Sequence, residues 1–146
     1  MNLPVCVDAS LMVKLALPEQ DSGLVRNLWA EWERRAVPRL VPTLWGYEVA
    51  SVIRKHGQRG TLSPQHEGEA LDYLLSLPVQ VVDMWGRHRD AWRLARDLGL
   101  TATYDAHYLL LARELGVEFW TGDRRLYNSV KGTLRWVRWI GELAEG

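Results

Sequence analysis

TATYDAHYLLLARELGVEFWTGD, residues 101–123, predicts a helix followed by a short buried strand. Apolar side chains recur at helical spacing over residues 108–115, and residues 117–120 form the apolar run that is typical of a parallel strand. Asp105 lies in the first turn of the expected helix, where the helix dipole favours an anion, and Asp123 follows the strand. Because ligands bind at the carboxyl ends of strands in open α/β sheets, we expect both carboxylates at one edge of a sheet.

The remainder of the sequence alternates short apolar runs with longer amphipathic segments. We expect further strands at residues 4–8, 39–41, 79–82 and 134–139, and helices at 11–17, 22–32, 45–56, 64–77, 86–98 and 124–128. This alternation predicts an α/β fold with a mostly parallel central sheet. A length of 146 residues fits one domain, which we place at residues 1–146.

Composition narrows the class of protein. The formal net charge is zero, so the protein has no overall positive potential that would indicate nucleic-acid binding. Basic side chains around an acidic site could still be present, because the acidic residues would cancel their charge in the net value. The single cysteine, Cys6, allows no disulfide within the chain, which fits a reducing cytosol. The first residues do not resemble a signal peptide, and no apolar run has the length of a membrane span. We therefore expect a cytoplasmic protein with no membrane partner.

Four carboxylates are candidates for a shared site. Asp8 ends the first strand, and Glu48 lies within the apolar helix LWGYEVASVI at 44–53, where an unpaired charge would be costly. Taken singly, each has an ordinary explanation as a helix cap, an exposed position or a turn residue. Together with Asp105 and Asp123, they would raise one another's pKa unless cations compensated. Oxygen ligands without a His or Cys cluster favour Mg²⁺ or Mn²⁺ over zinc, and such ions activate water for phosphodiester hydrolysis.

Four motifs resemble one known family. They are VDAS at 7–10, WGYEVASVIRK at 45–55, TYDAHYLLLARELG at 103–116 and TGDRRLYN at 121–128. In this order and spacing they resemble the PIN-domain ribonucleases, and most closely the VapC-type toxins of toxin–antitoxin pairs. The resemblance covers nearly the whole chain. It implies a three-layer α/β/α PIN fold, a Mg²⁺- or Mn²⁺-dependent endoribonuclease acting on RNA, inhibition by a cognate antitoxin protein, and a homodimer.

The resemblance also assigns residues to the site. Ser10 and Thr121 match small hydroxyl residues that often line it. Many relatives carry Asn at the position of Ser51, and some carry a further acidic residue just after the position of Asp123, where Arg124 stands. We therefore expect one tightly held ion, with a second ion arriving together with the substrate. The catalytic, metal-binding acidic residues implied by the resemblance are Asp8, Glu48, Asp105 and Asp123.

Several neighbouring residues receive simpler expectations. Arg124 and Arg125 follow Asp123 directly, so we expect them to contact RNA phosphates, and Lys14 is a weaker candidate for the same role. His107 is two residues beyond Asp105 and therefore lies on another face of the helix, which favours a structural role. We expect Trp29, Trp32, Trp45 and Tyr47 to pack in the core, although the first two could serve a protein interface and the last two could stack bases.

Other functions remain open at this point. One is an RNA-processing PIN nuclease that is not a toxin. Another is a catalytically idle PIN-like module that only binds other proteins, although all four acidic positions are filled. A phosphatase is disfavoured, because Asp8-Ala9-Ser10 lacks the second aspartate that a paired-aspartate phosphatase shows two residues on.

Overall fold

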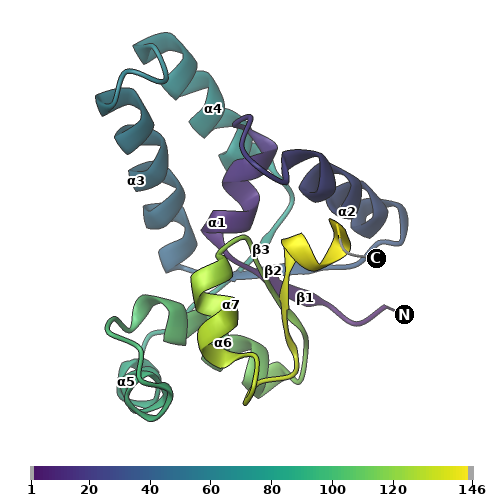
Figure 1. Ribbon diagram of the computed structural model, residues 1–146, viewed down its shortest axis with the longest axis vertical. Coiled ribbons are helices and arrows are strands. Elements are labelled where there is room, and N and C mark those ends of the chain that lie inside the picture. Colours follow the sequence, from purple (N-terminus) through teal and green to yellow (C-terminus); the bar gives the residue numbers. More distant parts are fainter. Residues whose placement is uncertain (1, 145–146) are drawn as a thin grey trace.

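The computed structural model describes residues 2–144, and a five-stranded parallel sheet forms its centre (Figure 1). The strand order is β3-β2-β1-β4-β5, with Cys6 of β1 opposite Leu40 of β2 on one side and Phe119 of β4 on the other. The bounds are β1 Val5–Val7, β2 Arg39–Pro42, β3 Gln80–Val82, β4 Phe119–Thr121 and β5 Val137–Trp139. The predicted α/β class and parallel sheet are confirmed.

Helices cover both faces of this sheet. The bounds are α1 Ala9–Met12, α2 Ser22–Arg34, α3 Leu44–Gln58, α4 Pro64–Ser76, α5 His88–Leu98, α6 Tyr104–Leu115 and α7 Arg124–Val130, with short 3₁₀ helices at η1 Val13–Leu15 and η2 Ile140–Ala144. Figure 1 shows α5 and α6 below the strands, and α3 and α4 as a hairpin that projects away from them. No helix within residues 2–144 is long and apolar enough to cross a membrane.

Strand β4 shows why the fold has three layers. Successive side chains of a strand point to opposite faces of the sheet. The Phe119 ring packs against Tyr108 of α6, with 5.9 Å between ring centroids. The next residue, Trp120, packs edge-on against Trp32 of α2, also at 5.9 Å. The sheet is therefore enclosed between two helical layers, as in the predicted α/β/α arrangement.

Local helix boundaries differ from the sequence prediction near the first strand. The first helix begins at Ala9 and not at residue 11, because the Asp8 side chain accepts a hydrogen bond from the Leu11 amide and caps it. Ser10 is consequently inside the helix. The second boundary that differs is the end of α3, which continues through Gly57 to Gln58. The start of α4 at Pro64 agrees with the predicted start at residue 64, and the Ser63 hydroxyl caps this helix by accepting from the His66 amide.

Candidate functional site

Asp8 lies where β1 ends and α1 begins, at the carboxyl edge of the sheet. Its side chain is buried, with an exposed fraction of 5%. One carboxylate oxygen, Oδ1, accepts hydrogen bonds from the Ser10 hydroxyl at 2.7 Å and from the Leu11 amide at 2.9 Å. The other, Oδ2, accepts from the Thr121 hydroxyl at the end of β4. Three residues thus hold this carboxylate in one orientation.

The turn Thr121-Gly122-Asp123 packs closely against the start of α1. The Gly122 amide donates to the Ser10 hydroxyl at 3.0 Å, and the Asp123 amide donates to the Thr121 hydroxyl at 2.9 Å. A Cβ atom at Gly122 would lie 2.7 Å from the backbone oxygen of Ser10, closer than such atoms normally approach. Only glycine therefore fits at this contact, and it brings the two predicted hydroxyl residues together beside Asp8.

Glu48 projects from α3 toward the same edge. Its Oε1 atom is buried and has no hydrogen-bond partner within residues 2–144. The buried Tyr108 hydroxyl faces it without completing a hydrogen bond. Burial raises the Glu48 pKa to about 7; the approach of Tyr108 lowers it, and the charges of Asp8 and Asp105 raise it further. A buried carboxylate oxygen without a donor is costly, and a cation ligated there would remove that cost.

Asp105 and Asp123 line one cavity of about 340 Å³. Asp105 is in the first turn of α6, as predicted. Its pKa is raised mainly by burial and, to a smaller extent, by the charge of Asp123. Asp123 caps α7, because its Oδ1 atom accepts from the amides of Arg125 at 2.9 Å and Leu126 at 3.2 Å. One oxygen of Asp123 is therefore committed to the helix terminus.

The four predicted carboxylates form an electrostatically coupled group. Burial raises the pKa of Asp8 to about 6, against the effect of its hydrogen bonds, and the charge of Asp105 adds to the rise. In the part of the chain that the structure describes, no three His, Cys, Asp or Glu side chains already surround a common point as a ligand cage. The arrangement is thus an open array at one edge. Its all-oxygen donors, with the unpartnered Oε1 atom of Glu48, fit a hard divalent cation.

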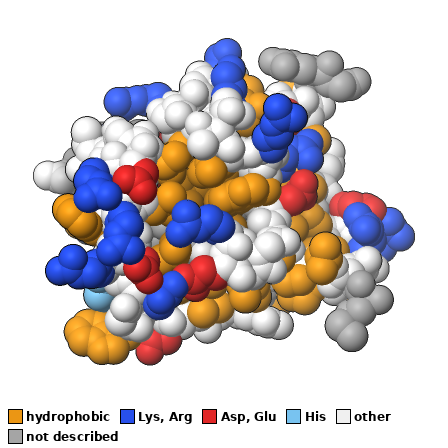
Figure 2. Space-filling model, turned by 90° about the horizontal axis from the view of Figure 1, so that it is seen from below, with side chains coloured by type: hydrophobic (Ala, Val, Ile, Leu, Met, Phe, Trp, Pro, Cys, Tyr) orange, Lys and Arg blue, Asp and Glu red, His pale blue; other side chains and the backbone are white. Residues whose placement is uncertain are grey.

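Basic side chains near this array differ in how free they are. Arg125 lines the cavity of Asp105 and Asp123, whereas the Arg124 guanidinium lies 5.2 Å from the centroid of the Trp139 ring. The prediction that Lys14 contacts RNA phosphates is wrong, because its buried ammonium donates to the Gln20 carbonyl at 2.8 Å. Figure 2 shows Lys and Arg side chains interspersed with acidic and hydrophobic ones on the face seen from below. Phosphate contacts would therefore depend on a few local cations.

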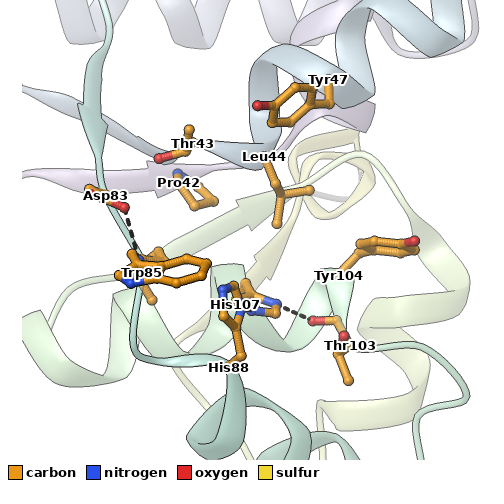
Figure 3. Close-up of a pocket in the computed structure, with 11 residues that line it drawn as sticks. Pro42, Thr43, Leu44, Tyr47, Asp83, Trp85, His88, Thr103, Tyr104 and His107 are labelled. Carbon is orange, nitrogen blue, oxygen red and sulfur yellow. Dashed lines mark hydrogen bonds between the residues drawn. The ribbon is translucent and has the colours of Figure 1, made fainter.

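Sequence reasoning missed an aromatic cavity beside the carboxylates (Figure 3). Tyr47 was expected in the core, yet 73% of it is exposed. The helical periodicity could have predicted this exposure. The buried residues of α3 are Trp45, Val49 and Ile53, and Tyr47 lies on another face of the helix. His107 has the structural role predicted for it, because it is buried and bonded to the Thr103 carbonyl.

Comparison with known proteins defines the family. Residues 5–131 match the PIN domain, and the chain belongs to the PIN domain family. It is 32% identical over 130 residues to Ribonuclease VapC3 of Pyrobaculum aerophilum, an alignment covering 85% of this chain and 92% of the relative.

Two solved structures share the fold. One is the crystal structure of PAE2754 from Pyrobaculum aerophilum, with a TM-score of 0.71 and 23% identity, over 97% of this chain and 86% of the other. The second is VapC20 of Mycobacterium tuberculosis, described as a Sarcin-Ricin loop cleaving toxin, with a TM-score of 0.59 and 18% identity, over 81% of this chain and 87% of the other. The predicted PIN fold is confirmed.

Proposed function

We propose that this protein is a metal-dependent endoribonuclease and the toxin of a type II toxin–antitoxin pair. The observation that carries the proposal is the buried, unpartnered Oε1 atom of Glu48. The charges of Asp8 and Asp105 raise the pKa of Glu48, and that of Asp105 also raises the pKa of Asp8. Such a group of carboxylates is unfavourable in the absence of a cation and becomes favourable when one is bound. Ribonuclease VapC3, at 32% identity, supports the nuclease assignment.

Asp8, Glu48 and Asp105 would hold one Mg²⁺ or Mn²⁺ ion, with Asp123 contributing directly or through water. When bound, the ion supplies an acidified water as nucleophile and positive charge for the phosphodiester. The chain's own residues orient this chemistry. Ser10 and Thr121 fix the Asp8 carboxylate by hydrogen bonds. Arg125, which lines the cavity of Asp105 and Asp123, would contact a phosphate of the RNA.

The toxin role rests on the relatives. Ribonuclease VapC3 carries the VapC name, and VapC20 is described as a Sarcin-Ricin loop cleaving toxin. By this likeness we propose a cognate antitoxin protein as partner, a homodimeric state and action in the cytoplasm. Induced expression in a bacterial host tests the role: growth should stop with the wild type and continue with Asp105→Asn. Continued growth with the wild type would favour an RNA-processing nuclease.

The cleavage test uses purified protein and a mixed RNA pool, with Mn²⁺ or Mg²⁺ in one arm and EDTA in the other. We expect cuts that need the metal and that disappear in Asp105→Asn. The matched control is Asp72→Asn, which removes an exposed carboxylate on α4 and should leave cleavage unchanged. Equal RNA degradation by the wild type and Asp105→Asn would contradict the proposed site.

A further inference from the structure

An aromatic cavity of about 380 Å³ opens beside the carboxylate array (Figure 3). Three aromatic side chains on its rim are largely exposed: Tyr47 by 73%, Trp85 by 82% and Tyr104 by 63%. They come from α3, from the segment after β3 and from the start of α6. Such exposure of large rings around one hollow is unusual for a surface without a ligand, because apolar area in water is unfavourable.

One of the three exposed rings, that of Trp85, packs against a neighbouring side chain. Trp85 packs edge-on against the ring of His88, with 5.5 Å between centroids. Its backbone amide donates to the Asp83 carboxylate at 2.9 Å, which fixes the segment after β3 (Figure 3). Ordered aromatic rims are suited to stacking against a flat ligand, since little conformational entropy is lost on binding.

The cavity adjoins a second hollow that Glu48 lines. Tyr47 directly precedes Glu48, and Tyr104 directly precedes Asp105. The same two tyrosines also line this second hollow, which is shared with Glu48, Ser51 and Lys55. A polynucleotide strand that passes Glu48 and Asp105 would therefore place one of its neighbouring nucleotides at the aromatic rim of the cavity.

Charge along this path favours a nucleic-acid strand over a peptide. Lys55 has no ion-pair partner within residues 2–144, and Arg125 likewise has none there, so both are available to phosphates. Lys55 lies on the Tyr47 side of the carboxylates and Arg125 on the Asp123 side. Cations that follow a backbone, combined with aromatic rings that receive bases, are the usual elements of single-strand binding.

Hydrogen-bond acceptors are among the polar atoms of the cavity lining. The Thr103 carbonyl accepts from His107 Nδ1, and His107 Nε2 lies 2.9 Å from His88 Nδ1. Asp83, also on the lining, is a carboxylate and only accepts. Acceptors of this kind suit a base that carries an exocyclic amino group.

We propose that this cavity binds one unstacked nucleobase of single-stranded RNA, next to the phosphodiester that is cut, and that it prefers adenine over uracil. The substrate class rests on the nuclease function proposed above. Trp85 stacks on the base, while Tyr47 and Tyr104 border it on the side of the carboxylates. The cavity thereby contributes to the choice of cleavage site.

The first test measures affinity without cleavage. Fluorescence anisotropy in EDTA follows the binding of labelled oligoadenylate and oligouridylate of equal length to the full chain. We expect oligoadenylate to bind more tightly, and Trp85→Ala to weaken its binding roughly 5- to 150-fold, the range for loss of one stacked base. Trp85→Phe should retain most of the affinity. The matched control is Trp92→Ala, an exposed tryptophan of α5 that does not line the cavity.

Equal oligoadenylate affinity in the wild type and Trp85→Ala would overturn the proposal, as would a preference for oligouridylate. Sedimentation equilibrium tests a protein occupant: if Trp85→Ala lowers the molar mass of the assembly and leaves RNA affinity unchanged, the cavity is a self-association surface and the proposal is wrong. The second arm maps cuts in Mn²⁺, where Trp85→Ala should still cleave but with a raised KM and a weaker base preference. Absence of cleavage by the wild type would contradict the nuclease function, while the affinity arm would still decide the base site.

Discussion

The Thr121 hydroxyl donates a hydrogen bond to the carboxylate of Asp8, a residue 113 positions earlier in the chain. The two meet because β1 and β4 are parallel neighbours in which Val7 lies opposite Trp120, so Asp8 and Thr121 form the next pair along the strands. The same hydroxyl oxygen accepts from the Asp123 amide at 2.9 Å. One small side chain therefore fixes two of the four carboxylate positions.

Thr121→Val should destabilise the protein and impair cleavage. Valine keeps the shape but removes the donor to Asp8 and the acceptor for the Asp123 amide, leaving buried polar groups unpaired. We expect a loss of about 1–3 kcal/mol in the free energy of unfolding, measured by urea denaturation. Because this hydroxyl lowers the Asp8 pKa, the variant should also need a higher pH for half-maximal activity. Thr133→Val, at an exposed loop position, is the control and should change neither quantity.

The metal-free protein should become less stable as the pH rises from about 4 to about 7. The Asp8 pKa is raised from 3.8 to about 6, so the folded state binds its proton more tightly than the unfolded chain does. This contribution is complete below the unfolded pKa and is lost as the pH passes the folded pKa. For Asp8 it amounts to roughly 3 kcal/mol, and Glu48, with a pKa of about 7, adds in the same direction.

Urea denaturation at a series of pH values, in EDTA and in Mn²⁺, measures this effect. In Mn²⁺ the decrease in the free energy of unfolding with rising pH should be smaller, because the cation binds the ionised carboxylates of the folded state. The difference between the wild type and Asp8→Asn isolates the contribution of Asp8. A wild-type profile in EDTA that matches that of Asp8→Asn would contradict the raised pKa.

Glu48→Gln should separate stability from activity. The amide removes a charge that burial and two neighbouring carboxylates disfavour, so the metal-free variant should unfold at a higher temperature than the wild type. It also removes a candidate metal ligand, so cleavage should fall by at least roughly 10- to 100-fold. Calorimetry and cleavage assays on one preparation measure both. A variant that is less stable, or as active as the wild type, would be inconsistent with the assigned role.

The position of the carboxylates at one edge of the sheet was largely predictable, because the parallel topology determines it. Asp8 and Asp123 follow strands, and Asp105 begins a helix, so a parallel sheet brings them to one edge whatever the detailed packing. The sequence prediction of the fold class needed only the alternation of strands and helices. The carboxylate positions came from that topology together with the motif resemblance.

The aromatic cavity and the Gly122 contact were not predictable in this way. Trp85 and Tyr104 meet Tyr47 only because the strand order places β3 and β2 beside β1, and no local pattern encodes that order. The Gly122 contact is likewise between the backbones of a turn after β4 and a helix after β1. Both features depend on long-range packing, which a single sequence does not reveal.

Two glycine substitutions should have opposite effects on stability. At Gly122 a Cβ atom would meet the Ser10 backbone at 2.7 Å, so Gly122→Ala should force α1 and the turn apart and destabilise the protein by about 1–3 kcal/mol. Gly68 is inside α4, and nothing lies within 4 Å of its would-be Cβ, so Gly68→Ala should stabilise by about 1 kcal/mol. Thermal unfolding followed by circular dichroism compares them. Equal midpoints for the two variants would contradict the close approach.

Arg125→Ala should weaken RNA binding in a manner that depends on salt. Arg125 lines the cavity of Asp105 and Asp123, where a phosphate of the cut strand would lie, and exposed cations bind phosphates largely by releasing counterions. Removing one such contact should reduce the slope of log affinity against log salt by about 0.7 for a single strand. Arg113→Ala is the matched control, because that exposed arginine is in the last turn of α6, away from the carboxyl edge of the sheet. Anisotropy titrations over a salt series in EDTA give both slopes. If both variants keep the wild-type slope, Arg125 does not contact phosphate; if Arg113→Ala loses as much as Arg125→Ala, binding follows overall charge and not a local path.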